Sequence, residues 1–484
     1  MSEQRDLRVI VIGAGMAGIL SAIKLRELGI TDVVIHEKAD RLGGTWRENT
    51  YPGIACDVPS HAYSYSFALN PEWSRHYAGG EEIQAYFEKV AADFGVTERI
   101  RFGSEVVRAE WIDGGWTVET GNGETDRAEI LIAATGVLHH PSMPDIPGLD
   151  TFEGASFHSA RWDHDVELEG KRVGVIGTGS TAVQITSALA DVVDNLSLFQ
   201  RTAQWVLPVP NPDYSPQELA DYAEHPDRVR DLHDDLGRRM TDLVSGALID
   251  ADSPGMKRIE DGCRANLETV VDPQLRERLT PDYRAACKRL VMSPDFYDKV
   301  QQPNVSLVTA KIEQVEPGGV RTADGELHEL DVLVLATGFR VDRFLRPMNV
   351  IGLDGVTLEQ AWTPRPLAYL AITVPGFPNL FMLNGPNGPV GNFSLIEIAE
   401  RQFAYITQLV EEVRSGRSVG LAPNAEATTA YEEARVEACT QTIWMSGCRS
   451  WYLDDRGVPA TWPWSFDRFC EEMAAPKLDA FDRV

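Results

Sequence analysis

The chain is 484 residues long, enough for about three domains of ordinary size. It carries 45 lysines and arginines against 73 aspartates and glutamates, so its formal net charge is −28. An acidic excess of this size repels phosphate backbones and acidic lipids, which argues against nucleic acids and membrane surfaces as partners. Hydrophobic residues make up 43% of the chain and charged residues 24%, as in a folded globular protein.

No segment predicts a membrane span or an export signal. The longest near-apolar run, residues 9–23, stops short of the ~18 residues that a membrane helix needs. The first predicted strand begins too early to leave space for a signal peptide. The six cysteines form no C-x-x-C pair, which argues against a zinc knuckle or a redox dithiol. We therefore expect a cytoplasmic protein with reduced thiols and no metal.

The first recognisable element is a dinucleotide-binding motif. An apolar strand at 9–12 precedes a glycine-rich turn and a predicted helix at 17–28, and a second strand at 33–35 ends near an acid. The first glycine makes the turn, the second lets the backbone approach the pyrophosphate, and the third lets the helix pack on the strand. The acid accepts hydrogen bonds from an adenosine ribose. These positions are Gly13, Gly15, Gly18 and Glu37.

The same order returns later in the chain. A strand at 173–176 leads into a second turn, in which Ala182 replaces the third glycine, and the next strand, 196–199, runs on to Arg201. Arg201 lies 24 residues after the first glycine of its motif, the register that Glu37 has in the first motif. A guanidinium there binds a 2′-phosphate that a carboxylate would repel, so this second site is expected to take NADP. A solvated surface arginine is the alternative. The turn residues are Gly177, Thr178, Gly179, Ser180 and Thr181.

Two dinucleotide sites in one chain indicate two nucleotides that exchange electrons, of which the usual pair is a bound FAD and a visiting NADPH. Two further strands, 131–134 and 332–336, fit as the returning strands of the two nucleotide domains. Each ends in the same dipeptide, Thr135–Gly136 and Thr337–Gly338. We therefore predict an α/β fold with two Rossmann-like dinucleotide-binding domains, for FAD and NADP, and a small helical insertion.

The predicted domain layout is discontinuous. The FAD-binding domain has a first segment at 1–140, and a linker with the first part of the NADP-binding domain follows at 141–210. A charge-rich stretch with leucines at helical spacing, 211–280, is the helical insertion. The NADP-binding domain resumes at 281–345 and the FAD-binding domain at 346–484. In this last segment, Ser394 and Glu397 form a capping-box pattern before a predicted helix.

Two motifs resemble those of the type I Baeyer–Villiger monooxygenases. The family fingerprint, F-x-G-x-x-x-H-x-x-x-W followed by Pro or Asp, is met at every fixed position by Phe152, Gly154, His158, Trp162 and Asp163. A second family pattern is met at Gly43, Gly44, Thr45, Trp46, Tyr51, Pro52, Gly53 and Asp57. The resemblance covers nearly the whole chain. Related flavin-containing monooxygenases usually lack the Trp–Asp ending.

The resemblance also implies residue roles. Arg289 would be the active-site arginine and Asp57 its carboxylate partner beside the flavin, although alone each is more often a surface cation or a turn residue. Lys288 would join Arg201 and Thr202 at the 2′-phosphate of NADPH. Further FAD contacts are implied for Gly44, Thr45, Trp46 and a turn containing Asn387. His158 and Trp162 resemble structural residues of a linker. For Trp451 two interpretations stay open: a contact to the nicotinamide ribose, or a residue of the hydrophobic core.

The implied reaction starts from NADPH, O2 and a small-molecule ketone and gives an ester or lactone through a flavin C4a-peroxide. Negative charge develops on the peroxide and on its adduct, and a fixed cation stabilises both. Arginine suits this role because it stays protonated, and a carboxylate orients it. Two alternatives stay open: S- or N-oxygenation through the hydroperoxide, or an uncoupled NADPH oxidase or electron carrier. Cys56 has no second cysteine four or five residues away, which argues against a disulfide reductase.

Overall fold

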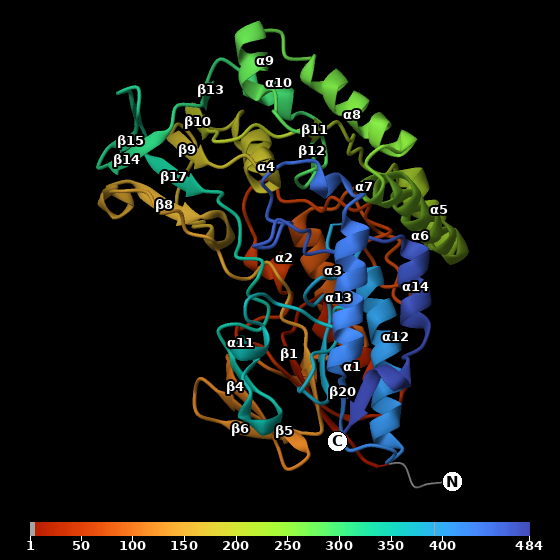
Figure 1. Cartoon of the computed structure of the whole chain (residues 1–484). Coiled ribbons are helices and arrows are strands. Elements are labelled where there is room, and N and C mark those ends of the chain that lie inside the picture. The colour runs from red at the N-terminus through yellow and green to blue at the C-terminus, as the bar shows by residue number, and fades with distance from the viewer. Residues whose placement is uncertain (1–4, 392) are drawn as a thin grey trace.

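A computed structural model describes residues 5–391 and 393–484 (Figure 1). The first of its two five-stranded sheets has the order β19-β7-β1-β2-β3, and all neighbouring strands are parallel. Alternate residues of its central strands face opposite layers, which is why each strand reads as a continuous apolar run. The strands are β1 (Arg8–Ile12), β2 (Asp32–His36), β3 (Ile100–Arg101), β7 (Ile130–Ala133) and β19 (Leu380–Met382).

Helices cover one face of the first sheet and a smaller sheet covers the other. The helical layer consists of α1 (Met16–Glu27), α3 (Gly80–Asp93) and α12 (Leu395–Arg414), and Val9, Val11 and Ile35 point into it. Ile10, Ile12 and Val34 point the other way, into the four-stranded sheet in the order β18-β4-β5-β6. Its strands are β4 (Val106–Ile112), β5 (Gly115–Thr120), β6 (Thr125–Ala128) and β18 (Asn349–Ile351).

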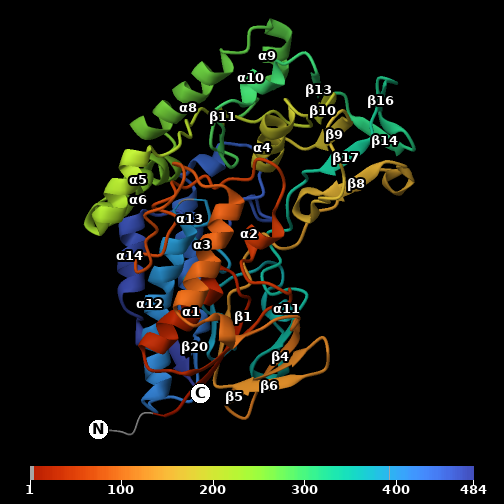
Figure 2. The same ribbon diagram turned by 180° about the vertical axis from the view of Figure 1, so that it is seen from behind.

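The second five-stranded sheet has the order β13-β10-β9-β17-β8 and is also parallel. Figures 1 and 2 show it above the first sheet, with α4 (Ser180–Leu189) against it. A three-stranded antiparallel sheet of β14, β15 and β16 lies at its edge. The strands are β8 (Ala155–His158), β9 (Arg172–Ile176), β10 (Asn195–Phe199), β13 (Val305–Val308), β14 (Ile312–Glu316), β15 (Gly319–Thr322), β16 (Leu327–Glu329) and β17 (Val332–Leu335).

The segment between β10 and β13 is largely helical, and its helices lie beside and above the two sheets (Figure 2). Four of them have proline in their first turn, where its missing N–H leaves no hydrogen bond unmade. The elements are β11 (Val206–Leu207), α5 (Pro216–Glu224), α6 (Pro226–Met240), a π-helical turn η4 (Thr241–Ser245), α7 (Gly246–Ile249), α8 (Pro254–Leu267), α9 (Pro273–Leu279), β12 (Val291–Met292) and α10 (Phe296–Val300).

The remaining elements are short or belong to the C-terminal part of the chain. They are α2 (Thr45–Glu48), α11 (Leu358–Ala361), β20 (Leu421–Pro423), α13 (Ala425–Cys439), α14 (Phe466–Ala474), β21 (Phe481–Arg483) and the 3₁₀ turns η1 (Thr97–Arg99), η2 (Leu149–Thr151), η3 (Ser159–Arg161), η5 (Leu353–Gly355), η6 (Ile443–Met445) and η7 (Leu478–Ala480).

The chain passes between the two large sheets twice, and the two passages pair with each other. Ser142 N donates to Gly338 O at 2.8 Å, and Arg340 N donates to His140 O at 2.9 Å. Pro141 and Phe339 form an antiparallel bridge between them. The connection is therefore a short two-stranded ribbon.

Two sequence expectations are wrong. The capping box before α12 does not form: within the described residues Ser394 makes no side-chain cap bond, and its hydroxyl instead donates to Ala62 O at 3.4 Å. The thiols are not all reduced, because Cys287 and Cys448 form a disulfide with a Cα–Cα distance of 6.1 Å. These cysteines are 161 residues apart, so only the fold brings them together.

Candidate active site

A cavity of about 1760 Å³ runs between the two nucleotide motifs. It is lined from one side by the turn after β1 and from the other by the turn after β9. The carboxyl ends of parallel strands at such turns are where open α/β sheets bind ligands.

The first turn is shaped for the close approach of a pyrophosphate. Gly13 has φ +99°, and a Cβ there would lie 2.6 Å from Ala134 O. The N-cap of α1 is Gly15, which offers no side-chain acceptor to the first N–H groups of the helix, so they are free for an anion. Gly44 approaches Gly15 so closely that a Cβ on it would lie 3.1 Å from the Gly15 Cα. Gly18 does not line the cavity; a Cβ on it would lie 1.9 Å from Gly13 O, so it serves the packing of α1.

Glu37 directly follows β2 at the rim of this first site and is almost fully buried. Its Oε2 accepts from Ala14 N at 2.8 Å, and its Oε1 accepts from Ala39 N at 3.0 Å and from Arg47 Nη1 at 3.0 Å. Carboxylate oxygens have further lone pairs for the hydroxyls of a ribose. These residues fit an adenine dinucleotide with a free 2′-hydroxyl, as FAD has.

The second turn repeats this geometry. Gly177 has φ +128°, and a Cβ there would lie 2.3 Å from Ala336 O. The N-cap of α4 is Gly179, and of the described residues none lies within 4 Å of the place its Cβ would take, so the helix terminus opens into the cavity. Thr178 Oγ1 donates to Thr202 O at 2.7 Å and holds the next strand end in place. Ser180 and Thr181 line the cavity as well.

Two cations lie together beyond the second turn. Arg201 is exposed, and the ammonium of Lys288 lies 4.4 Å from the centre of the Tyr283 ring. Burial lowers the pKa of Lys288, and the nearby charge of Arg201 lowers it further. Both residues and Thr202 line the cavity. Two cations that line the same part of the cavity fit a 2′-phosphate, and hence NADP.

Arg289 and Asp57 form an ion pair in the cavity, between Arg289 Nη2 and Asp57 Oδ2. About a third of each side chain is exposed, 36% and 31%, so the pair faces the cavity and not a closed core. The charge of Asp57 raises the pKa of Arg289 above its already high value. The guanidinium is thus a permanent cation. The hydroxyl of Tyr452, which no sequence pattern had singled out, lies beside it.

The fingerprint residues lie at the edge of the second sheet. Gly154 is required by space, since a Cβ there would lie 2.3 Å from Asp331 O. His158 Nδ1 accepts from Ala160 N, so its other nitrogen donates to Gly338 O, at 3.1 Å. Trp162 packs edge-on against Phe157, and Phe152 packs against the core of this sheet. None of Phe152, Gly154, His158, Trp162 and Asp163 is among the described residues that line the cavity.

The other predicted contacts divide into two groups. Thr45, Trp46, Thr135, Gly136, Thr337 and Gly338 line the cavity. Asn387 is not among the described lining residues; Asn384, at the start of the same turn, lines it instead. Trp451 is 42% exposed and lines the cavity, which removes the interpretation of it as a core residue.

Two glycine turns that fit nucleotides of different 2′ chemistry line one cavity with a permanent cation, which is the arrangement expected of a pyridine-nucleotide-dependent flavoprotein. Residues 10–228 match the family described as pyridine nucleotide-disulphide oxidoreductase. Among residues 5–391 and 393–484, none of the helices combines the length and the apolar composition that a membrane span requires.

Known proteins narrow this class. The chain is 49% identical over 460 residues to an "uncharacterized monooxygenase" of Mycobacterium tuberculosis, covering 94% of this chain and 92% of that one. It is 41% identical over 472 residues to a Baeyer–Villiger monooxygenase of Streptomyces coelicolor, covering 96% and 90%. The solved structure of cyclohexanone monooxygenase from Rhodococcus sp. Phi1 bound to NADP⁺ superposes with a TM-score of 0.86 at 31% identity, covering 97% and 96%.

The chain therefore belongs to the type I Baeyer–Villiger monooxygenase family. Its fold is that of a flavoprotein with two Rossmann-like domains, and its cofactors are FAD and NADPH.

Proposed function

We propose that this chain inserts one oxygen atom next to the carbonyl of a small-molecule ketone, giving an ester or lactone. One atom of O2 enters the product and the other leaves as water, with two electrons from NADPH. The observation that carries the proposal is the Arg289–Asp57 ion pair, which lines the cavity shared by both nucleotide turns.

FAD, when bound, would accept hydride from NADPH and activate dioxygen. Arg289 provides the positive charge against which negative charge grows on the transferred oxygen and on the former carbonyl oxygen. A fixed charge that needs no reorganisation stabilises that growth. Asp57 offsets the cost of keeping the guanidinium in a partly buried place and sets its direction.

We assign the nucleotide contacts residue by residue. Gly13, Gly15, Gly44 and the first turn of α1 hold the FAD pyrophosphate, and Glu37 holds its ribose. Gly177, Gly179 and the first turn of α4 hold the pyrophosphate of NADPH, and Arg201, Thr202 and Lys288 hold its 2′-phosphate. His158 has a structural role, because its two ring nitrogens tie β8 to the passage at Gly338.

Two wider proposals follow. We propose the five segments 1–140, 141–210, 211–280, 281–345 and 346–484 as the domain layout. We propose the cytoplasm as the location, because NADPH is the reductant maintained there.

The test is a panel of ketones and thioethers, incubated with NADPH and ¹⁸O2 and followed by mass spectrometry. The proposal expects an ester or lactone that carries one heavy oxygen atom. A FAD-loaded protein that oxidises only thioethers would favour heteroatom oxygenation. Hydrogen peroxide in equal amount to the NADPH consumed, whatever the substrate, would show an uncoupled oxidase.

A further inference from the structure

The Arg289 guanidinium has a second polar neighbour besides Asp57. The hydroxyl of Tyr452 lies beside it, and Tyr452 is 4% exposed. The Tyr452 ring stacks on Trp451 with a centroid distance of 4.0 Å and lies 5.5 Å from the ring of Trp444. Arg289 is thus held between a carboxylate from one nucleotide domain and a phenol from the C-terminal part of the chain.

Gly391 makes room for this contact. Its φ is +89°, and a Cβ built on it would lie 2.2 Å from Tyr452 Oη and 3.4 Å from Arg289 Nη1. Contacts below 3.0 Å are not tolerated by real Cβ atoms, so any other residue at 391 would displace the hydroxyl. The backbone here is shaped around the Tyr452–Arg289 pair.

The segment that carries Tyr452 is fixed before and after it. Before it, the disulfide joins Cys448 to Cys287, two residues from Arg289. Within it, Ala460 N donates to Tyr452 O at 2.6 Å.

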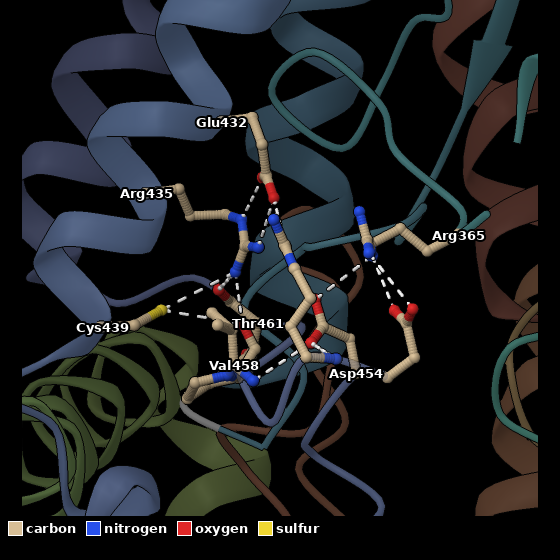
Figure 3. A network of polar contacts seen from close by, with 10 residues as sticks. Arg365, Glu432, Arg435, Cys439, Asp454, Val458 and Thr461 are labelled. Carbon is tan, nitrogen blue, oxygen red and sulfur yellow. Dashed lines mark hydrogen bonds and ion pairs between the residues drawn. The ribbon is translucent and has the colours of Figure 1, made fainter. Parts of the chain in front are cut away.

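After it, the chain is clamped to α13 by a fully buried arginine, Arg435 (Figure 3). Arg435 bonds Glu432 and donates to the carbonyl oxygens of Pro459 and Thr461. Glu432 in turn holds Arg456. Removing Arg435 would free the segment, and with it the phenol.

We propose that Tyr452 is a positioning residue for Arg289: its hydroxyl oxygen accepts from the guanidinium and fixes the plane in which the remaining N–H groups face the cavity. The contact to Asp57 joins Nη2 to a single oxygen, Oδ2, and leaves the guanidinium free to turn about it. A second acceptor removes that freedom. This inference rests on the proposed function of Arg289.

A phenol suits this place better than a second acid. Burial raises the pKa of Tyr452, so the hydroxyl stays neutral over the working range of pH. A neutral acceptor orients the cation and leaves its charge intact, whereas a second carboxylate would cancel the charge that the reaction uses.

The test compares Tyr452→Phe with Tyr431→Phe in the FAD-loaded protein. Tyr431 is a matched control, because its hydroxyl is also buried and has no hydrogen-bond partner among residues 5–391 and 393–484. We expect Tyr452→Phe to lower the fraction of NADPH converted to ester by about tenfold, the usual cost of a hydrogen bond to a charged group. The lost fraction leaves as hydrogen peroxide. The rate of flavin reduction, the Kd for NADP⁺ and the Tm stay at wild-type values, and Tyr431→Phe changes none of these quantities.

A double-mutant cycle with Gly391→Ala separates positioning from packing. If both changes act through the same hydrogen bond, Gly391→Ala lowers the ester fraction by a smaller factor in Tyr452→Phe than in the wild type, because the backbone strain of alanine at φ +89° is common to both and cancels in the cycle. Additive effects would overturn the inference, as would a wild-type ester fraction in Tyr452→Phe or an equal fall in NADP⁺ affinity and Tm. If the wild type makes no ester from any ketone, the proposed function itself fails, which is a different result.

Discussion

Glu37 and Arg47 form a nearly buried ion pair in the wall of the cavity, beside the turn after β1. Arg47 Nη1 lies 3.0 Å from Glu37 Oε1, and only 10% and 5% of the two side chains are exposed. Arg47 also bonds Glu48 at 2.6 Å. The carboxylate that we assign to the ribose is therefore paired with a nearly buried cation.

Removal of that cation should weaken FAD binding. In Arg47→Met the Glu37 carboxylate stays buried without its partner, which costs about 3 kcal/mol. We expect the purified variant to lose most of its flavin absorbance. Arg41→Met is the control, because Arg41 is 57% exposed and its pair with Glu88 lies at the surface. Full flavin occupancy in Arg47→Met would contradict the assignment of Glu37 to the ribose.

Arg289→Ala should separate the two halves of the reaction. Hydride transfer uses the nucleotide sites alone, whereas oxygen transfer needs the cation. We expect NADPH consumption to continue as hydrogen peroxide forms, and ester formation to fall by about 10² to 10³, the usual cost of losing one donor to a developing oxyanion. The ratio of ester to peroxide measures this. An unchanged ratio would remove Arg289 from the chemistry.

The paired cations at the second site should decide between NADPH and NADH. Loss of Arg201 or Lys288 removes a charge-assisted bond to the 2′-phosphate, so Arg201→Ala and Lys288→Ala should each raise KM for NADPH about tenfold. KM for NADH, which lacks that phosphate, is the internal control and should stay unchanged. An equal rise in KM for NADPH and for NADH would show that Arg201 and Lys288 do not contact the 2′-phosphate.

The Cys287–Cys448 bond should stabilise the fold. It closes a loop of 161 residues, for which disulfides contribute roughly 2–5 kcal/mol. We expect Cys448→Ser to lower the Tm, and a reducing agent to lower the Tm of the wild type but not of the variant. Cys263→Ser, at a buried free cysteine, serves as control. Six titratable thiols in unreduced, unfolded protein would show that the bond is absent.

Acid should weaken the connection between the domains at His139. Burial lowers the pKa of His139 to about 4, and its neutral ring donates to Phe344 O at 3.0 Å. The unfolded chain takes up this proton near pH 6.5 and the folded chain does not, so the stability from this group is full above about 6.5 and falls as pH drops toward 4. His139→Gln keeps a donor that cannot titrate, and its Tm should fall less over that range. Parallel Tm curves for the two proteins would exclude this origin.

The parts that the sequence predicts are local. The strands β1, β2, β9 and β10 are apolar runs at fixed distances from their glycine turns, so both strand–turn–helix units follow from spacing alone. The Arg289–Asp57 pair was expected only from family resemblance, because its members are 232 residues apart.

The features that could not be predicted from the sequence are contacts between residues that only the tertiary structure brings together. Ser394 has the right neighbours for a capping box, but the fold offers it Ala62 O instead. Gly391 belongs to no sequence motif. It is needed because the side chain of Tyr452, distant in the sequence, occupies the space that a Cβ at position 391 would take. The Glu37–Arg47 ion pair could not be predicted either, because no sequence pattern indicates that these two side chains meet.

The two-stranded ribbon at Pro141 and Phe339 has a mechanical consequence. A single connector allows one body to swivel freely about it, whereas two strands that are hydrogen-bonded side by side resist torsion and bend most easily across their flat face. We therefore expect any movement of the part that carries the turn after β9 against the part that carries the turn after β1 to bend the ribbon across its face more readily than to twist it.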